Sequence, residues 1–316
     1  MKKIALIGFG KHATKNIIPA ISRLKDIDVE SVYVRKVDNY LAKADEHGVS
    51  VKRIDESIND EVQWVYISTP ISTHYELIRK YLELGKNVIC EKPLTDDLKK
   101  TRVLFELAKQ EGVKLYEVNM YHYHRQFEHL KNTISENLGT LKKVNARFTI
   151  PHLPKDDIRY QNKMGGGSLL DVGFYPISII TSLFGSPTNI HSTQFSEVGY
   201  KVDLFGSAIF EFGSFYCIAE WGIGLPYTNE VIVTTEKQII KYDRIFSKTE
   251  TIQTFVKIKE GLDTYTVDIG NDDHFVNMLR VQLFNMLPNN YTVNIKQSID
   301  VISAIEKINK LENECN

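Results

Sequence analysis

The first third of the chain alternates short apolar runs with segments of helical pattern. A continuous apolar run such as 4–7 is typical of a parallel strand that is buried on both faces. Strands that alternate with helices indicate βαβ units and a doubly wound parallel sheet. The strands that we expect here are 3–8, 29–35, 64–68, 87–90 and 114–118.

The pattern changes after residue 119. A helical stretch at 127–137 is followed by segments in which apolar and polar residues alternate, and such alternation is typical of an antiparallel sheet with one covered face. Apolar residues three and four apart at 295–308 predict an amphipathic helix. The alternating segments are 143–150, 207–212, 215–221 and 230–235.

This change of pattern and the length of 316 residues both predict two domains. We expect an α/β domain with a parallel sheet at 1–119, and at 120–316 an α+β domain with a large, open, mostly antiparallel sheet. No low-complexity linker separates them, so we expect close contact, and the C-terminal helix can pack back on the first domain. The second sheet has too few helices to cover both faces, which predicts a homo-oligomer through that sheet.

Composition narrows the class of protein. The chain is 42% hydrophobic and 25% charged, as ordinary soluble globular chains are, which excludes disordered and collagen-like classes. The 39 Lys and Arg residues against 40 Asp and Glu leave a net charge of −1. No overall field therefore attracts nucleic acid or an anionic membrane, and we expect a small-molecule partner instead.

The cysteines and the N-terminal residues bear on the compartment. Cys90, Cys217 and Cys315 are too few and too scattered for a disulfide framework or a zinc site, which favours a reducing compartment. Gly8 and Gly10 interrupt the first apolar run before it reaches the length of a signal or membrane segment. We therefore expect a cytoplasmic protein.

The turn after the first expected strand has the pattern of a dinucleotide-binding loop. Residues without a Cβ let the chain turn sharply and let its amides approach a pyrophosphate, which then faces the N-terminus of the following helix. Ala13 stands where close helix–strand packing tolerates only Gly or Ala. The alternative is a merely structural turn. The position of the motif at the first strand-to-helix turn favours a cofactor loop. The loop comprises Gly8, Phe9, Gly10, Lys11, His12 and Ala13.

The end of the second expected strand indicates which dinucleotide binds. An acid there would read the ribose of NAD, whereas a base pairs with the 2′-phosphate of NADP. Arg35 and Lys36 follow this strand, and a guanidinium both stacks on adenine and pairs with phosphate. We predict NADP rather than NAD. The alternative is two solvated charges at a strand end.

Several motifs, in order along most of the chain, resemble the glucose-fructose oxidoreductase, inositol dehydrogenase and rhizopine-catabolism (Gfo/Idh/MocA) family. The most specific of them is the Glu91-Lys92-Pro93 triplet after a strand. The others are 64–70 (WVYISTP), His74, 85–90 (GKNVIC), 120–124 (MYHYH), Ile158-Arg159 and 165–176 (GGGSLLDVGFYP).

The resemblance implies an N-terminal Rossmann domain, a C-terminal α/β domain whose open sheet often forms a subunit interface, and nicotinamide-dependent hydride transfer on sugars and polyols. A homodimer or homotetramer through that sheet is therefore expected. The resemblance also implies that the cofactor site extends beyond the glycine-rich loop. The further cofactor-binding positions are Thr69, Pro70, His74, Glu91 and Lys92.

Lys92 matches the family's catalytic lysine, which lies near the nicotinamide and the reacting oxygen. An ammonium at that place stabilises the alkoxide charge that develops as hydride arrives. Pro93 would fix the turn, and the isomer of the Lys92–Pro93 peptide bond stays open. The alternative for Lys92 is a solvated lysine in a turn.

Asp171 and Tyr175 form the second catalytic element that the resemblance implies. If a helix begins near Gly167, residues four apart share one face, so both side chains point into one pocket. Tyrosine stands here in the branch that includes dihydrodiol dehydrogenases and nucleotide-sugar 3-ketoreductases. A phenol has a reference pKa near 10, so it suits proton donation and favours reduction as the direction. The alternative is a buried core tyrosine.

Three more residues complete the expected substrate site, which also includes Lys92, Asp171 and Tyr175. Arg159 matches an arginine of the same branch and could hold an anionic or polar group of the substrate. Tyr121 and His124 belong to a loop that lacks the arginine and proline more common in the family. His122 and His124, two apart without a neighbouring acid or thiol, have poor spacing for a metal, so we expect none.

These observations together predict an NADP-dependent oxidoreductase that reduces a keto group on a sugar. The substrate class that we favour is a nucleotide-linked keto-deoxysugar. One alternative is a dehydrogenase of a free sugar, polyol or diol. Another is a non-catalytic NADP-sensing regulator, against which the presence of both Lys92 and Tyr175 speaks.

Overall fold

The computed structural model describes residues 1–287 and 289–315, which form two compact units. One unit comprises Met1–Val118 and Phe275–Ser298, and the other comprises Asn119–His274 and the residues from Ile299 onward. The first unit thus takes in residues 275–298, which the sequence pattern places in the second domain. One contact that joins residues 275–298 to the first unit is the hydrogen bond that Nζ of Lys2 donates to the backbone carbonyl of Leu283 across 2.7 Å.

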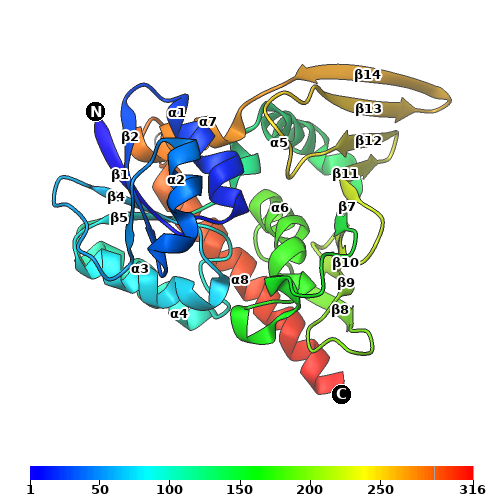
Figure 1. Cartoon of the computed structure of the whole chain (residues 1–316). Helices are drawn as coiled ribbons and strands as arrows, with labels where there is room; N and C mark the ends of the chain where they lie inside the picture. The colour runs from blue at the N-terminus through cyan, green and yellow to red at the C-terminus, as the bar shows by residue number, and fades with distance from the viewer. Residues whose placement is uncertain (288, 316) are drawn as a thin grey trace. The chain divides into compact units, whose positions relative to one another are not determined.

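The first unit contains a parallel sheet of six strands in the order β3-β2-β1-β4-β5-β6, with helices packed against it (Figure 1). Its central strand β1 is almost completely buried from Ile4 to Ile7, as the apolar run predicts. The strands are β1 (Lys2–Ile7), β2 (Ile27–Val34), β3 (Val51–Arg53), β4 (Trp64–Ile67), β5 (Asn87–Cys90) and β6 (Leu115–Glu117). The five expected strands are present, whereas the short edge strand β3 carries two basic residues and no apolar run.

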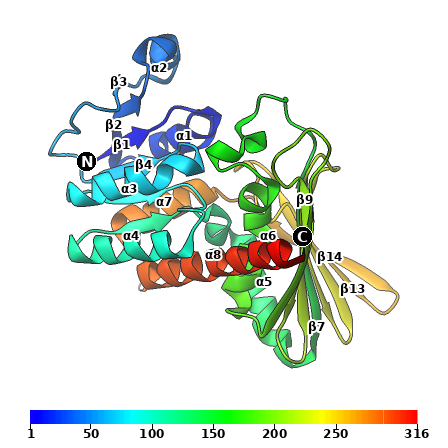
Figure 2. The same cartoon turned by 90° about the horizontal axis from the view of Figure 1, so that it is seen from below.

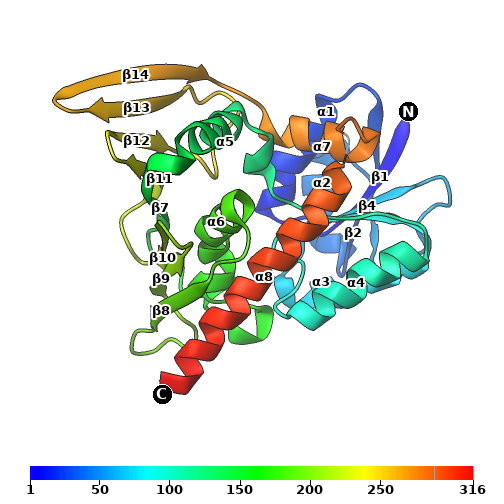
Figure 3. The ribbon, with the colours of Figure 1, turned by 180° about the vertical axis from the view of Figure 1, so that it is seen from behind.

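The first helical segment begins a few residues after the end of β1, beyond the glycine-rich loop. The chain after β1 is π-helical at Ala13–Ile17 and continues as α1 (Ile18–Ser22). The other helices are α2 (Leu41–His47), α3 (His74–Glu83), α4 (Leu98–Gln110), α7 (His274–Phe284) and α8 (Asn290–Cys315). Helix α8 is one continuous helix whose residues are shared between the two units (Figure 3).

The second unit contains an eight-stranded sheet in the order β14-β13-β12-β11-β7-β10-β9-β8. Strands β10 and β7 pair in parallel and the other neighbours are antiparallel, which confirms the expected mostly antiparallel sheet. The strands are β7 (Leu141–Ile150), β8 (Asn189–Phe195), β9 (Phe205–Glu211), β10 (Tyr216–Ile223), β11 (Thr228–Thr235), β12 (Gln238–Asp243), β13 (Thr254–Glu260) and β14 (Asp263–Gly270).

Helices α5 (Arg125–Asn137) and α6 (Phe174–Phe184) lie against one face of this sheet, and none of the described helices covers the opposite face (Figure 2). Helix α6 follows a π-helical turn at Leu169–Gly173. The stretch Asn162–Phe184 is long and apolar enough to cross a membrane by length and composition, but 67% of it is buried inside the protein. That burial is typical of a core helix, and it makes the helix a rigid support for the residues at its N-terminal end.

Candidate functional site

The loop between β1 and the first helix requires glycine at its start and is open in its middle. Gly8 has a φ of +97°, and a Cβ there would lie 2.4 Å from the carbonyl oxygen of Ser68. A Cβ on Gly10 would meet no atom within 4 Å. The chain becomes helical directly afterwards, so the loop presents an open backbone surface at the start of a helical segment.

Phe9 anchors this loop in the protein instead of facing outward. Its side chain is buried, with its ring 5.9 Å from that of Tyr40 and 6.0 Å from that of His47. The Nζ of Lys43 donates to the backbone carbonyl of Phe9 across 2.8 Å. The side chain of Phe9 is therefore turned into the protein, while the side chain of Lys11 is exposed.

His12 and Glu91 connect the glycine-rich loop to the loop after β5. The Nε2 of His12 lies 2.7 Å from Oε1 of Glu91, and the Tyr66 hydroxyl donates to the same oxygen across 2.5 Å. Burial raises the pKa of Glu91, but His12, the Tyr66 hydroxyl and Lys92 lower it, and the result is below its ordinary value. Glu91 is thus an ionised bridge at the base of the Lys92 loop.

His74 is buried between two backbone carbonyl oxygens. Its Nδ1 lies 2.9 Å from the oxygen of Pro93, and its Nε2 lies 2.8 Å from the oxygen of Thr69. Burial lowers the pKa of His74, although both carbonyls act in the opposite direction. His74 thus joins the Thr69 loop to the Lys92 loop, whose Lys92–Pro93 peptide bond is cis, and a direct contact of its side chain with the cofactor stays a prediction.

The remaining expected cofactor residues lie at the ends of β2 and β4. Arg35 and Lys36 follow β2 directly, and both side chains are exposed. Thr69 and Pro70 follow β4, where the Thr73 hydroxyl donates to Oγ1 of Thr69 across 2.7 Å. Because these strands are parallel, their carboxyl ends meet at one edge of the sheet together with the Gly8 and Lys92 loops, which is where dinucleotides bind in such folds.

In the second unit, a turn of three glycines leads into the helix that bears Asp171 and Tyr175. A Cβ on Gly166 would lie 2.6 Å from the carbonyl oxygen of Arg159, and one on Gly167 would lie 2.4 Å from Oδ1 of Asp203. Gly167 also has a φ of +116°. Only glycine therefore fits this turn, which sets the direction of the helix that follows.

Asp203 caps this helix, and the sequence pattern does not predict this capping role. Its Oδ2 accepts from the Ser168 hydroxyl across 2.5 Å and from the backbone amide of Leu169 across 2.7 Å. Burial raises the pKa of Asp203, and these two donors oppose that rise. Since it lies 35 residues after Ser168 in a connection between strands, only the tertiary structure reveals this role.

Asp171 and Tyr175 are the two half-exposed positions of the otherwise buried segment 171–181. They lie four residues apart, across the junction between the π-helical turn and α6. Their exposure on a buried helix sets them apart from core positions. The two side chains therefore lie four residues apart on one helical segment, and their shared pocket and catalytic role stay predictions.

Arg159 pairs with Asp171, a partnership that the sequence analysis does not predict. The guanidinium Nε lies 2.5 Å from Oδ2 of Asp171, and Nη1 lies 3.2 Å from Oδ1 of Asp157. The charge of Asp171 raises the pKa of Arg159, against the effect of burial. Arg159 and Asp171 are therefore one ion pair, in which each fixes the other, and not two independent substrate ligands.

Aromatic rings surround Tyr175. The Phe148 ring meets it edge-on at 5.0 Å, and the Phe246 ring lies at 5.7 Å. Tyr121 lies at 6.3 Å and is itself packed against Phe246. Phe148 and Phe246 come from β7 and from the connection after β12, so the sequence pattern gives no indication that they meet at Tyr175.

Tyr121 and His124 are buried side chains with partners inside the protein, and their expected contact with substrate stays a prediction. Tyr121 is fully buried, and its hydroxyl lies 2.5 Å from Oγ of Ser178. His124 is 2% exposed, and its Nδ1 accepts from the backbone amide of Gln126 at the start of α5. Burial lowers the pKa of His124 to about 4, so its ring is neutral near pH 7.

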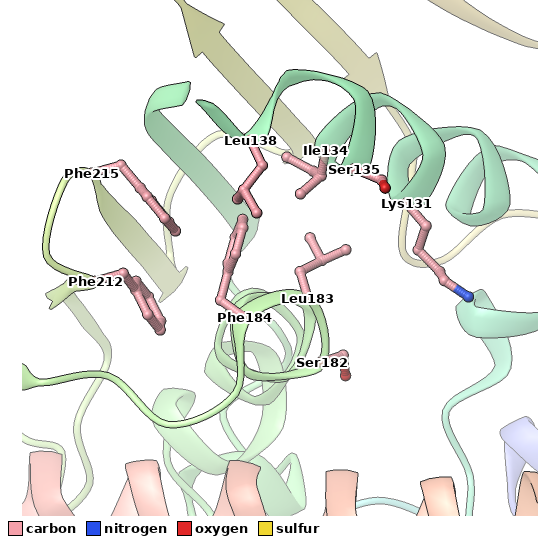
Figure 4. Close-up of a pocket in the computed structure, with 9 residues that line it drawn as sticks. All are labelled: Lys131, Ile134, Ser135, Leu138, Ser182, Leu183, Phe184, Phe212 and Phe215. Carbon is pink, nitrogen blue, oxygen red and sulfur yellow. The ribbon is translucent and has the colours of Figure 1, made fainter. Parts of the chain in front are cut away.

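A hollow of about 530 Å³ lies elsewhere on the second unit, between the C-terminal halves of α5 and α6 (Figure 4). It contains none of the expected site residues, and it begins at Ser182, about two helical turns beyond Tyr175. Its walls are mainly apolar. Its lining consists of Lys131, Ile134, Ser135, Leu138, Ser182, Leu183, Phe184, Phe212 and Phe215. In the part of the chain that the structure describes, no group of three or more His, Cys, Asp or Glu residues could hold a metal ion.

Comparison with known proteins finds relatives along most of the chain. A dTDP-3,4-didehydro-2,6-dideoxy-alpha-D-glucose 3-reductase of Actinomadura kijaniata is 33% identical over 178 residues, which is 55% of this chain and 54% of the relative. A D-xylose 1-dehydrogenase (NADP(+)) of Haloferax volcanii is 29% identical over 214 residues, 66% of this chain and 65% of the relative. The matched region thus spans between half and two thirds of these relatives' own length.

The comparison with solved structures covers almost the whole chain. The crystal structure of a 3-ketoreductase from Actinomadura kijaniata in complex with NADP and TDP-benzene superposes with a TM-score of 0.89 at 25% identity, over 97% of each chain. Two family models also match: the oxidoreductase family with an NAD-binding Rossmann fold at residues 2–120, and the GFO/IDH/MocA C-terminal domain at residues 127–241. Both halves of the chain, each with its own sheet and motifs, therefore belong to the Gfo/Idh/MocA oxidoreductase family.

Proposed function

We propose that this chain is an NADP-dependent oxidoreductase that reduces the keto group of a nucleotide-linked keto-deoxysugar. The observation that carries the proposal is the half-exposed pair of Asp171 and Tyr175 on an otherwise buried helix, with Tyr175 inside a ring of aromatic side chains. The relatives named as 3-ketoreductases of such sugars support the substrate class.

The residues of the first unit fit a dinucleotide. The backbone at Gly10 is open on the side where a pyrophosphate would approach, and Gly8 permits the turn that exposes it. Arg35 and Lys36 would hold the adenosine 2′-phosphate at the end of β2. When bound, NADPH supplies the hydride for the carbonyl carbon.

The protein's own groups supply charge and a proton. Lys92 would place its ammonium by the carbonyl oxygen, where it stabilises the negative charge that develops there. The phenol of Tyr175 would donate its proton to the resulting alkoxide, because an ordinary phenol is protonated near neutral pH. The Arg159–Asp171 ion pair would orient a polar group of the sugar, and the exposed part of the Arg159 guanidinium is free to reach it.

The test is an assay of two substrate classes. The purified protein is given NADPH with dTDP-3,4-didehydro-2,6-dideoxy-α-D-glucose and, separately, NADP⁺ with free aldoses and polyols. We expect turnover of the first class with a kcat/KM at least 10²-fold above the second. The xylose dehydrogenase relative favours the opposite order, which would assign a free-sugar dehydrogenase. NADPH binding without turnover of either class would favour a regulator.

Cofactor choice gives the first prediction. The Arg35→Asp variant places a carboxylate where the 2′-phosphate would bind, so NADPH affinity should fall at least tenfold and NADH should become the tighter ligand. Calorimetric titration of both nucleotides measures the order. Arg53→Asp is the matched control, because Arg53 lies on β3 of the same sheet and its guanidinium pairs with Asp55. A wild type that prefers NADH would contradict the prediction.

The helix-free face of the second sheet bears an apolar row across its central strands. Ile209 pairs with Ile218 across β9 and β10, and Asn145 of β7 stands between Ile218 and Ile232. Tyr216, two residues before Ile218 and on the same face, is 41% exposed. Charged residues flank this row, with Arg147 2.8 Å from Glu220. An apolar row of this kind on an open sheet is typical of a subunit interface.

We therefore predict a homodimer or homotetramer through this face. Light scattering at micromolar concentration should give twice or four times the mass of one chain. The Ile218→Asp variant buries an unpaired charge in the interface, so it should dissociate the oligomer. Val103→Asp, at an exposed apolar position on α4, is the control that should keep the wild-type mass. A monomeric wild type would contradict the prediction.

We place the protein in the cytoplasm. Cys90 and Cys217 are buried free thiols, and burial raises the pKa of both, so neither is poised to form a disulfide. The side chain of Cys315 lies outside the described residues.

A further inference from the structure

The loop that carries Lys92 is held by side chains from four other elements of the first unit. His12 and Tyr66 hold the carboxylate of Glu91 on one side of Lys92. On the other side, His74 holds the carbonyl of Pro93. A third contact in the loop is made by the backbone amide of Leu94.

Glu117 is the partner of this amide. It is the last residue of β6 and is only 2% exposed, and its Oε1 accepts from the backbone amide of Leu94 across 2.9 Å. The backbone of Glu117 is itself fixed from both sides, because its amide donates to Oδ1 of Asn294 and its carbonyl accepts from Nδ2 of the same residue, each across 3.0 Å. The carboxylate therefore approaches the loop from a rigid strand end.

A buried glutamate at the end of β6 costs free energy, and packing alone does not explain why Glu117 stands there. A buried carboxylate is unfavourable unless it is hydrogen-bonded, and an apolar side chain would fill the end of β6 without that penalty. The acceptor that Glu117 provides is directed at the second residue after Lys92. A shift of about 1 Å in a catalytic group can change a rate about 10²-fold, so a fixed loop has a direct value for catalysis.

We infer that Glu117 is a positioning residue for Lys92: its carboxylate holds the Leu94 amide, and through it the loop that presents the Lys92 ammonium. The inference rests on the proposed function, in which Lys92 stabilises charge at the reacting oxygen. In this role Glu117 acts through the loop.

The experiment is a double-mutant cycle in the full-length protein, with dTDP-3,4-didehydro-2,6-dideoxy-α-D-glucose and NADPH. The variants are Glu117→Leu, which removes the acceptor, Glu117→Gln, which keeps one, and each of these combined with Lys92→Ala. Asn87→Ala is the matched control, because Asn87 accepts from the Lys114 amide between the same two strands, β5 and β6, at their opposite end.

We expect Glu117→Leu to lower kcat at least tenfold with NADPH affinity within twofold, and Glu117→Gln to keep at least a third of kcat. In the Lys92→Ala background, Glu117→Leu should change kcat less than twofold, because the group that it positions is gone. A full tenfold loss in that background, or an equal loss in Asn87→Ala, would overturn the inference in favour of a merely structural role. If Glu117→Leu does not fold, Asn294→Leu replaces it, since it releases the Glu117 backbone.

A second readout does not depend on turnover. Lysines are labelled by reductive ¹³C-methylation, and the Lys92 signal is assigned by its loss in Lys92→Ala. Glu117→Leu should shift this signal and Asn87→Ala should leave it in place. An unchanged signal would overturn the inference, whereas a shifted signal in a protein whose Lys92→Ala variant keeps full activity would refute only the proposed role of Lys92.

Discussion

Phenylalanine at position 175 is expected to lower kcat roughly 10²–10⁴-fold, the range typical of a lost general acid. The change removes only the hydroxyl and keeps the ring that packs on Phe148 and Phe246, so the second unit should keep its structure. The affinity for NADPH should stay within twofold, because the Gly8 loop belongs to the other unit. Steady-state kinetics with calorimetric NADPH binding measures both quantities.

The matched control is Tyr242→Phe in the same unit. The hydroxyl of Tyr242 donates to Oγ1 of Thr133 across 2.7 Å, so its loss should reduce the free energy of unfolding by about 1 kcal/mol without a comparable loss of kcat. If Tyr175→Phe keeps near-wild-type turnover while deuterated NADPH shows that hydride transfer limits the rate, Tyr175 is not the acid. A bound water would then be the candidate, since buried His124, with a pKa of about 4, is deprotonated at neutral pH.

Removal of the Lys92 ammonium is expected to lower kcat at least 10²-fold. The expected size of this decrease follows from the loss of one charge-stabilising donor at the reacting oxygen, which typically lowers kcat about 10²–10³-fold. Lys92→Ala should fold as the wild type does, because contacts of Glu91, Pro93 and Leu94 hold the loop and remain in the variant. Single-turnover measurements of NADPH oxidation give the rate of the chemical step directly.

Two further lysine variants separate charge from position. Lys92→Arg keeps a cation but in a larger planar group, and we expect it to recover only a small part of the rate. Lys86→Ala is the control at the opposite end of β5, where the Lys86 ammonium donates to backbone carbonyls of the first unit. Wild-type turnover in Lys92→Ala, measured when the chemical step is slow, would show that Lys92 is a solvated residue of the turn.

The central strands of the first sheet and the glycine-rich loop follow from local features of the chain. The runs that form β1, β4 and β5 are continuously apolar because both faces of a parallel sheet are buried, and this signature needs no knowledge of partners. Gly8 is required by its own backbone conformation. In contrast, β8, β12, β13 and β14 were not predicted. In β12, β13 and β14 large apolar side chains such as Ile239, Phe255 and Tyr265 also stand at exposed positions, so polarity does not separate the two faces.

The sequence by itself therefore determined the two-sheet architecture, the family motifs and the places of Lys92, Asp171 and Tyr175 along the chain. Only the tertiary structure decided the partners of these residues. Arg159 proved to be paired with Asp171, and His74 and Glu117 proved to hold the loop of Lys92. The physical reason is the distance along the chain over which each effect acts. Periodicity and backbone preference act over a few residues, whereas the partner of a buried polar group comes from any distant segment that packing brings within about 3 Å.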